Sequence, residues 1–304
     1  MAIADGRHRG FSPWPGPHPE IGDPLTSDAA IMNDDGDGAI MNENGMEARF
    51  NAAREIARDA GRLALKHFLL RDTLKVETKG VHDLVSEADR DVEALISSQL
   101  MALFPDDGFI GEETGVKAGG MKAAGIWVVD PIDGTASFLD GIPAWCVSIA
   151  YVVGSEIEIG VIYDPNAEEL FAARRGHGAT LNDRPIRARR AGGFKDGRVG
   201  IGYSLRVDPR PTVTAIERLL TGGGMYVWNG SGALMLAYVA AGRLIGYYEA
   251  HINAWDCLAG IGLIREAGGW TNDFLADDGL IHGNVIAAGA PGLAEAMRHL
   301  AGLN

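Results

Sequence analysis

The sequence places two carboxylates and a hydroxyl close together, at Asp130, Asp133 and Thr135. They follow directly on the apolar run of residues 125–129, which predicts a buried strand. Polar residues at the end of a buried strand are where an α/β protein commonly places its chemistry. Carboxylates and the carbonyl of Ile132 can bind hard cations, and the backbone amides after Asp133 can bind a phosphate. We therefore predict that one loop holds both metal and anion.

Further acidic residues lie beside the ends of predicted elements: Asp89 in the first turn of a helix, Glu112 and Glu113 after a short apolar run, and Asp256 at a helix start. Clustered Asp and Glu without Cys or His ligands indicate magnesium rather than zinc. A solvated charge or a helix cap is the usual alternative for an acidic residue. That alternative stays open for Asp89 and Asp256, whereas the density of polar groups argues against it for residues 130–135.

The elements that must position these residues follow from apolar periodicity. A long amphipathic helix is predicted from Met46 to Phe68, and a second from Ser86, its N-cap, to Phe104. Strand-like runs then predict an antiparallel-rich sheet, and the second half alternates strands and helices as in an α/β fold. The expected strands are 127–129, 145–153, 157–163, 170–173, 197–203, 225–228, 244–249 and 285–288, and the later helices are 212–220, 233–241, 255–267 and 293–300.

This pattern predicts one domain, residues 46–304, in which a sub-domain of residues 46–190 carries the metal site and residues 191–304 complete the cleft. Residues 1–45 are rich in Gly, Pro, Asp and Asn without apolar periodicity. Such a segment cannot build a core, and we interpret it as a disordered tail or a mis-assigned start.

Composition narrows the class of protein. The 304 residues are 46% hydrophobic and 22% charged, as in a globular chain, and carry a formal net charge of −14. That charge argues against general nucleic-acid binding, and implies that an enzyme acting on phosphates would need metal. The basic clusters Arg174-Arg175 and 187–190 are interpreted as solvated faces.

Two cysteines, Cys146 and Cys257, form no C-x-x-C pair and are expected in the core. They fit a reducing compartment. No apolar run approaches the roughly 18 to 20 residues that span a bilayer, and no signal pattern is present. We expect a cytoplasmic protein without a membrane segment. His251 has no second histidine at ligand spacing, which predicts an exposed or hydrogen-bonded histidine rather than a zinc ligand.

Four motifs in order resemble the inositol monophosphatase family of magnesium-dependent, lithium-sensitive phosphomonoesterases, over about residues 46 to 304. The motifs are Lys79 with Asp83-Leu84-Val85-Ser86 and Asp89; Gly111-Glu112-Glu113; Trp127-Val128-Val129-Asp130-Pro131-Ile132-Asp133-Gly134-Thr135; and Trp255-Asp256 with Ala259-Gly260 and Glu266-Ala267-Gly268-Gly269. One such motif would be weak evidence, whereas four in the family order are strong. The resemblance implies a mixed α/β (α+β) fold, a layered αβαβα sandwich of the inositol monophosphatase and fructose-1,6-bisphosphatase type, and a homodimer.

The resemblance also implies a site with two or three Mg²⁺ ions. The implied metal ligands are Glu112, Asp130, the Ile132 carbonyl, Asp133 and Asp256. Thr135, with Glu112 and Asp89, is implied to orient and activate the attacking water, and Glu113 is an implied outer partner. Gly134 and Thr135 are implied to hold the phosphate through backbone amides at a helix N-terminus, where the dipole favours anions.

For the alcohol part of the substrate, the resemblance implies contacts from Gly230, Ser231, Gly232 and Glu249, in addition to Asp133 and Asp256. The backbone of residues 230–232 is implied to meet a sugar-like ring, and Glu249 to accept a ring hydroxyl. A plain helix cap for Ser231 and a strand-end charge for Glu249 are the open alternatives.

The implied reaction is hydrolysis of inositol monophosphate or a similar small polyol phosphate, by in-line attack of metal-activated water. No phosphoenzyme is expected, because no D-x-D-type or cysteine nucleophile motif lies beside the metal loop. One alternative is the same chemistry on histidinol phosphate, fructose 1,6-bisphosphate or a 3′-phosphoadenosine nucleotide. Glu249 favours the inositol type, whereas Ser137, where inositol-type members usually carry asparagine, favours the histidinol type. The other alternative is an RNA- or transcription-associated regulatory protein with secondary phosphatase activity.

Overall fold

The computed structural model of the protein describes residues 42–74, 76–80, 83–117 and 122–303. The helices and strands in these ranges belong to one compact unit, Glu43–Asn304. The expectation for residues 1–45 lies outside the described residues, except for residues 42–45. The side chains of Lys79 and of residues 83–85, from the first motif, also lie outside the description.

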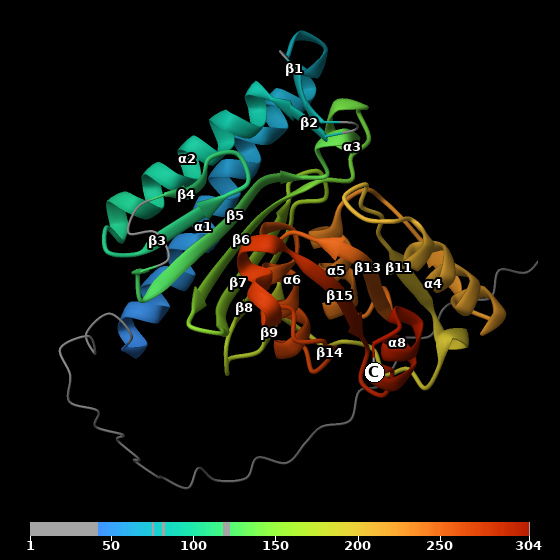
Figure 1. The fold of residues 1–304 in the computed structure, drawn as a ribbon. Coiled ribbons are helices and arrows are strands. Elements are labelled where there is room, and N and C mark those ends of the chain that lie inside the picture. The colour runs from blue at the N-terminus through green and yellow to red at the C-terminus, as the bar shows by residue number, and fades with distance from the viewer. Residues whose placement is uncertain (1–41, 75, 81–82, 118–121, 304) are drawn as a thin grey trace, which may run out of the picture. The chain divides into compact units, whose positions relative to one another are not determined.

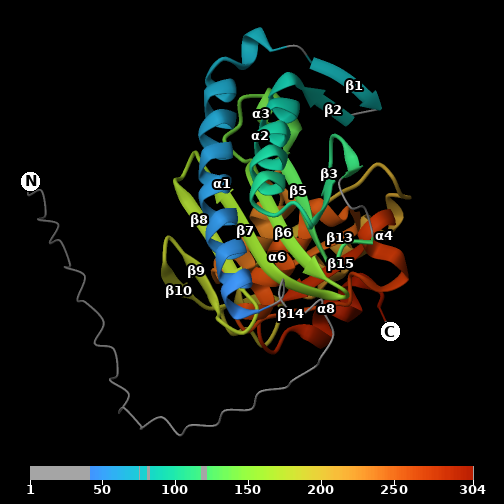
Figure 2. The same ribbon diagram turned by 90° about the vertical axis from the view of Figure 1, so that its left-hand side faces the viewer.

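The unit is built of five layers (Figure 1). Helices α1 (Glu43–Leu69) and α2 (Glu87–Leu103) run side by side over one face of an eight-stranded sheet, as Figure 2 shows. Helices α5 (Gly232–Ala240) and α6 (Ala254–Glu266) separate that sheet from a five-stranded sheet, and α4 (Arg210–Thr221) and α8 (Ala294–Ala301) pack on the second sheet. This order confirms the predicted αβαβα sandwich.

The eight-stranded sheet supports the predicted metal loop. Its spatial order is β10 (Arg184–Ile186), β9 (Ala179–Leu181), β8 (Glu169–Arg174), β7 (Glu156–Asp164), β6 (Cys146–Val153), β5 (Gly125–Asp133), β3 (Gly108–Gly111) and β4 (Gly115–Lys117). All neighbouring pairs are antiparallel except β3 with β5, which confirms the predicted antiparallel-rich sheet. All nine residues of β5 are buried, and this burial explains their near-continuous apolar character.

The second sheet has the order β12 (Met225–Val227), β11 (Arg198–Ile201), β13 (Gly246–Ile252), β15 (Asn284–Gly289) and β14 (Trp270–Thr271). Strand β11 is parallel to both of its neighbours, whereas β15 is antiparallel to β13 and β14. A hairpin of β1 (Val76–Gly80) and β2 (Asp83–Ser86) precedes α2. The predicted division at residue 190 stays a prediction, because α5 and α6 contact strands of both large sheets.

Helix α1 begins earlier than its apolar periodicity indicates, at Glu43 rather than Met46. Arg174, on β8, forms ion pairs with Glu43 and with Glu47, so charged groups rather than apolar ones hold the first turn. The predicted solvated face is therefore wrong for Arg174, which is only 4% exposed. It is correct for the neighbouring Arg175, whose side chain is 53% exposed.

A buried polar network joins α1 to the sheet around Asp107, which is 1% exposed. Its carboxylate accepts hydrogen bonds from Arg49 Nε at 2.9 Å and Nη2 at 2.8 Å, from Trp127 Nε1 at 3.0 Å and from Tyr151 Oη at 3.0 Å. A buried charge is tolerated when it is paired and fully hydrogen-bonded. This network therefore fixes α1 on the sheet, in part through Trp127 of β5, the strand that also carries Asp130.

Cys146 and Cys257 are both free and buried, which confirms them as core residues. Burial raises the pKa of each thiol well above its usual value. Among the described residues, no helix combines the length and the apolar character needed to cross a membrane.

Candidate functional site

An irregularity in β5 brings two of the predicted ligands to the same side of the strand. Residues three apart on a regular strand point to opposite faces. Here Asp130 pairs with Ser148 and Asp133 pairs with Cys146, so β5 carries one extra residue over this interval. Such a bulge restores a common direction for the two side chains. The Asp130 carboxylate also accepts the Ile132 amide at 2.9 Å, which holds the bent segment.

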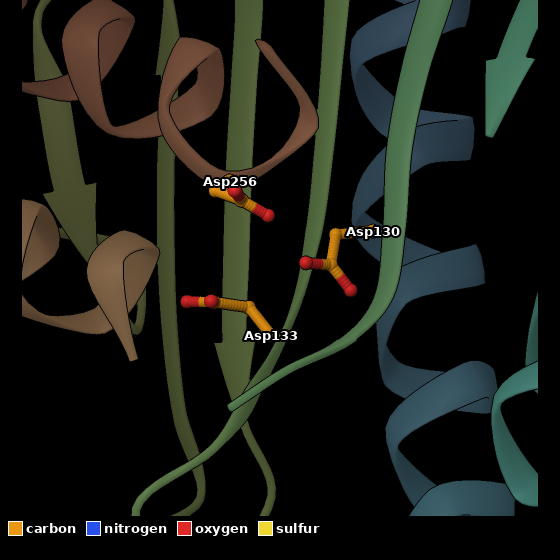
Figure 3. A group of neighbouring side chains, drawn as sticks. All are labelled: Asp130, Asp133 and Asp256. Carbon is orange, nitrogen blue, oxygen red and sulfur yellow. The ribbon is translucent and has the colours of Figure 1, made fainter. Parts of the chain in front are cut away.

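Helix α6 supplies the third carboxylate. Asp256 is the third residue of the helix, and its Oδ2 accepts the backbone amide of the N-cap Asn253 at 3.2 Å. The cap interpretation of Asp256 is thus correct, yet the same side chain joins the cluster. One carboxylate oxygen from each of Asp130, Asp133 and Asp256 lies within 4.8 Å of the others. In Figure 3, Asp256 reaches toward Asp130 on β5, with Asp133 beside them.

The cluster is electrostatically unfavourable without a cation. Burial, followed by the charges of Glu112, Asp133 and Asp256, raises the pKa of Asp130 well above its usual value. Burial and the charge of Asp256 raise the pKa of Asp133 to about 7. Three carboxylates held together, with Asp130 and Asp133 buried and Asp256 half-buried, favour a positive charge that compensates them when they are ionised. The donor set, all oxygen, fits a hard divalent cation.

Thr135 links the cluster to α2. Its hydroxyl lies 3.1 Å from the Ile132 carbonyl and 3.2 Å from Asp89 Oδ1, and its single proton can be donated to only one of them at a time. Asp89 is fully buried, and its Oδ2 accepts the backbone amide and hydroxyl of Ser86 at 2.8 and 2.7 Å. Asp89 is therefore both the N3 residue of the capping box of α2, whose N-cap is Ser86, and the partner of Thr135. Burial raises the pKa of Asp89, although these hydrogen bonds oppose the rise.

The chain after Asp133 turns into the short helix α3 (Thr135–Leu139). Gly134 caps it with a φ of 99°, and a Cβ there would lie 2.8 Å from the Ala144 carbonyl oxygen. Only glycine fits this left-handed, crowded position. The predicted helix N-terminus is present at these residues, which line a cavity together with the cluster.

Ser231 lies behind the cluster rather than at its open side. It is fully buried, caps α5 by accepting the Leu234 amide at 3.2 Å, and donates its hydroxyl to Asp133 Oδ2. The Ala233 amide donates to the same oxygen at 2.7 Å. The helix-cap interpretation of Ser231 is confirmed, and the cap additionally orients Asp133.

A cavity of about 200 Å³ opens over the cluster. Its walls include the predicted residues Glu112, Asp130, Ile132, Asp133, Gly134, Thr135, Gly230, Gly232, Glu249 and Asp256. The side chains of Asp89 and Ser231 are not part of the wall but contact residues that are. Glu249 lies within β13, not at its end, and accepts a hydrogen bond from Tyr247 Oη at 2.5 Å. Burial raises the pKa of Glu249 to about 8.

The residues of the wall that were not predicted include Tyr203, Arg206, Trp228 and Tyr247. The first two follow β11, which is parallel to β13, so the ends of both strands meet at one edge of the sheet. That rule of parallel sheets is the signal by which the loop after β11 could have been identified. His251 donates a hydrogen bond from Nε2 to the His282 carbonyl oxygen at 2.9 Å, which confirms a hydrogen-bonded histidine.

The metal-free protein should lose stability as the pH rises from about 4 to about 8. The folded-state pKa values of Asp133 and Glu249, about 7 and about 8, lie above those of an unfolded chain, so protonation favours the fold. This contribution is present below about pH 4 and is lost as each group ionises. Melting temperatures of EDTA-treated protein at pH 5 and pH 8 test this, and Mg²⁺ should raise the value more at pH 8. Equal melting temperatures, or a higher one at pH 8 without metal, would contradict it.

Comparison with known proteins places this chain in a family. The family described as "Inositol monophosphatase family" matches residues 46–301. An inositol-1-monophosphatase of Rhizobium meliloti is 37% identical over 84% of this chain and 93% of its own length. A protein of Xylella fastidiosa named Nus factor SuhB is 40% identical over 75% of this chain and 82% of its own. The crystal structure of extragenic suppressor protein suhB from Bartonella henselae is similar with a TM-score of 0.78 and 34% identity, covering 84% of this chain and 98% of that one. The chain belongs to the inositol monophosphatase family, as its sequence motifs indicated.

Proposed function

We propose that this protein is a Mg²⁺-dependent phosphomonoesterase that hydrolyses inositol monophosphate or a similar small polyol phosphate. The observation that carries this proposal is the cluster of Asp130, Asp133 and Asp256 in the wall of a cavity that is also lined by Glu249. The cluster suits cations and Glu249 suits hydroxyl groups, so the phosphate and the alcohol of a phosphorylated polyol have separate partners.

In this proposal two or three Mg²⁺ ions are held by Glu112, Asp130, the Ile132 carbonyl, Asp133 and Asp256. When bound, Mg²⁺ would supply positive charge that neutralises phosphoryl oxygens and lowers the pKa of water. The hydrogen bonds from Ser231 and the Ala233 amide occupy Asp133 Oδ2, which leaves Oδ1 for a ligand. The backbone amides of Gly134 and Thr135 then receive the phosphate.

The proposed role of Thr135 and Asp89 is to orient water for in-line attack on phosphorus. When the Thr135 hydroxyl donates a hydrogen bond to Asp89 Oδ1, 3.2 Å away, the lone pairs of its oxygen are free to accept a hydrogen bond from water. The buried Asp89, fixed through Ser86, cannot turn away. Glu112, on the turn that follows β3, is proposed to be a further acid beside this water. No covalent phosphoenzyme is required.

Glu249, also in the cavity wall, is proposed to accept a hydrogen bond from a hydroxyl of the alcohol, with Tyr247 fixing one carboxylate oxygen. Gly230 and Gly232 offer backbone next to it. Arg206 is the cationic side chain in the wall, and we propose that it attracts the anionic substrate toward the cavity. From family resemblance we further propose a homodimer, inhibition by Li⁺ and a cytoplasmic location.

The test is phosphate release from a panel of esters with and without Mg²⁺. The panel contains myo-inositol 1-phosphate, histidinol phosphate, fructose 1,6-bisphosphate and a 3′-phosphoadenosine nucleotide. We expect Mg²⁺-dependent hydrolysis, fastest on the inositol ester. Faster hydrolysis of another ester would replace the substrate but retain the chemistry. Absence of turnover for every ester in the presence of Mg²⁺ would refute the proposal.

A second candidate is a regulatory role, because several relatives bear the name Nus factor SuhB. The two roles can be separated by the Asp130→Asn variant. Growth that depends on hydrolysis should be lost with this variant, whereas a regulatory role carried by the protein surface should survive. The intact set of acids favours catalysis as the primary role.

A further inference from the structure

Helix α2 bears a second buried acid, Glu93, one turn after Asp89. Residues four apart lie on the same face of a helix. Both side chains are buried, with Asp89 fully enclosed and Glu93 1% exposed. Asp89 contacts Thr135, whereas Glu93 contacts the turn that follows β3. One rigid helix face therefore meets two separate parts of the proposed catalytic site.

The contacts of Glu93 hold that turn at consecutive positions. Its Oε2 accepts the backbone amide of Glu113 at 2.8 Å, and its Oε1 accepts the hydroxyl of Thr114. At Gly111 a Cβ would lie only 2.4 Å from Glu93 Oε2. The glycine thus allows the carboxylate to lie directly against the backbone. Glu112, a wall residue of the cavity, is enclosed between these anchored positions.

A carboxylate suits this place better than a carboxamide. Both of its oxygens accept hydrogen bonds, one from the Glu113 amide and one from the Thr114 hydroxyl. Glutamine has nearly the same volume, but its amide group presents donors on one side. That side would face either the Glu113 amide or the Thr114 hydroxyl. A substitution therefore disturbs the turn without removing side-chain volume.

We propose that Glu93 is a positioning residue that fixes the turn carrying Glu112, so that Glu112 faces the carboxylate cluster. The shared face of α2 couples this turn to the Thr135–Asp89 pair. This inference rests on the proposed function, because it requires Glu112 to bind a cation. Glu93 itself does not touch substrate or metal in this proposal.

The test compares Mg²⁺ binding by wild-type protein, Glu93→Gln and Thr114→Val. The readouts are the rise in melting temperature with Mg²⁺ concentration and the Mg²⁺ concentration for half-maximal hydrolysis. Loss of an outer partner of a metal ligand weakens binding by about 10- to 100-fold. We expect about a 10-fold higher Mg²⁺ requirement for Glu93→Gln by both readouts, with KM for the ester little changed. Thr114→Val removes only the Oε1 contact and should give a smaller change, about 3-fold, by partial loss of the same effect.

Asp107→Asn is the matched control, because it alters another buried carboxylate that contacts the fold but not the cavity. It should lower the melting temperature and leave the Mg²⁺ requirement unchanged. An unchanged Mg²⁺ requirement in Glu93→Gln would overturn this inference but leave the proposed function standing. If Glu93→Gln does not fold, an unchanged Mg²⁺ requirement in Thr114→Val would overturn this inference. A wild-type protein that Mg²⁺ neither stabilises nor activates would overturn the proposed function, and this inference with it.

Discussion

Changing Asp130 to Asn should remove Mg²⁺-dependent hydrolysis and, at the same time, stabilise the metal-free protein. The variant loses the buried carboxylate that forms a cluster with Asp133 and Asp256. Activity should fall by more than about 100-fold, since loss of even an outer partner of a metal ligand costs up to that factor. Stability should change in the opposite direction, because burial and three neighbouring acids raise the pKa of Asp130 and oppose its ionisation.

The measurement pairs initial rates at saturating Mg²⁺ with melting temperatures in EDTA and in Mg²⁺, at pH 8. Wild-type protein should melt lower than Asp130→Asn in EDTA and gain more from Mg²⁺. The exposed Asp208→Asn, whose partner Arg210 lies on the surface, serves as a control and should leave both readouts near the wild-type values. A variant that retains activity, or that is less stable than wild type in EDTA, would contradict the assignment of Asp130.

Changing Asp107 to Asn should produce a large loss of stability without a loss of chemistry. The substitution removes the negative charge that pairs with the buried Arg49 and places amide protons against the donors of Trp127 or Tyr151. Removing one partner of a buried ion pair costs about 3 to 5 kcal/mol. At about 2–4 °C per kcal/mol for a chain of this size, we expect the melting temperature to fall by about 6 to 20 °C.

Thermal unfolding followed by circular dichroism measures this effect, and kcat at 25 °C provides the comparison. Equal stability of Asp107→Asn and wild type would show that the network around Asp107 is dispensable. A reduced kcat at a temperature where the variant is fully folded would show that the network acts on the site as well.

The order of layers was implied by the family resemblance, whereas the long elements themselves could be predicted because they leave a long periodic pattern in the sequence. The pattern from Met46 to Phe68 predicted α1, and only its first turn was missed, since Arg174 acts there from a distant strand. Short strands such as β4, β9 and β14 were not predicted. They have two or three residues, too few to show alternation, and they form because neighbouring strands offer hydrogen-bonding partners.

The site was predictable only in part for a related reason. Residue types and spacing identified Asp130 and Asp133, and the motif resemblance implied them as metal ligands, whereas ideal strand geometry would have placed them on opposite faces. The bulge that aligns them depends on pairing with β6, which the local sequence does not reveal. Glu93 contacts a turn about 20 residues later in the chain, and Arg206 enters the cavity from the second sheet. Such residues become visible only when distant segments meet.

The central claim is that the cluster of Asp130, Asp133 and Asp256 holds the Mg²⁺ that phosphate-ester hydrolysis requires. The most direct measurement is phosphate release from myo-inositol 1-phosphate by wild-type protein and Asp130→Asn, first stripped with EDTA and then titrated with Mg²⁺. We predict that stripped wild-type protein is inactive, that Mg²⁺ restores its activity, and that no Mg²⁺ concentration restores Asp130→Asn to the wild-type rate. Equal hydrolysis by the stripped protein, or by the variant, would contradict the claim.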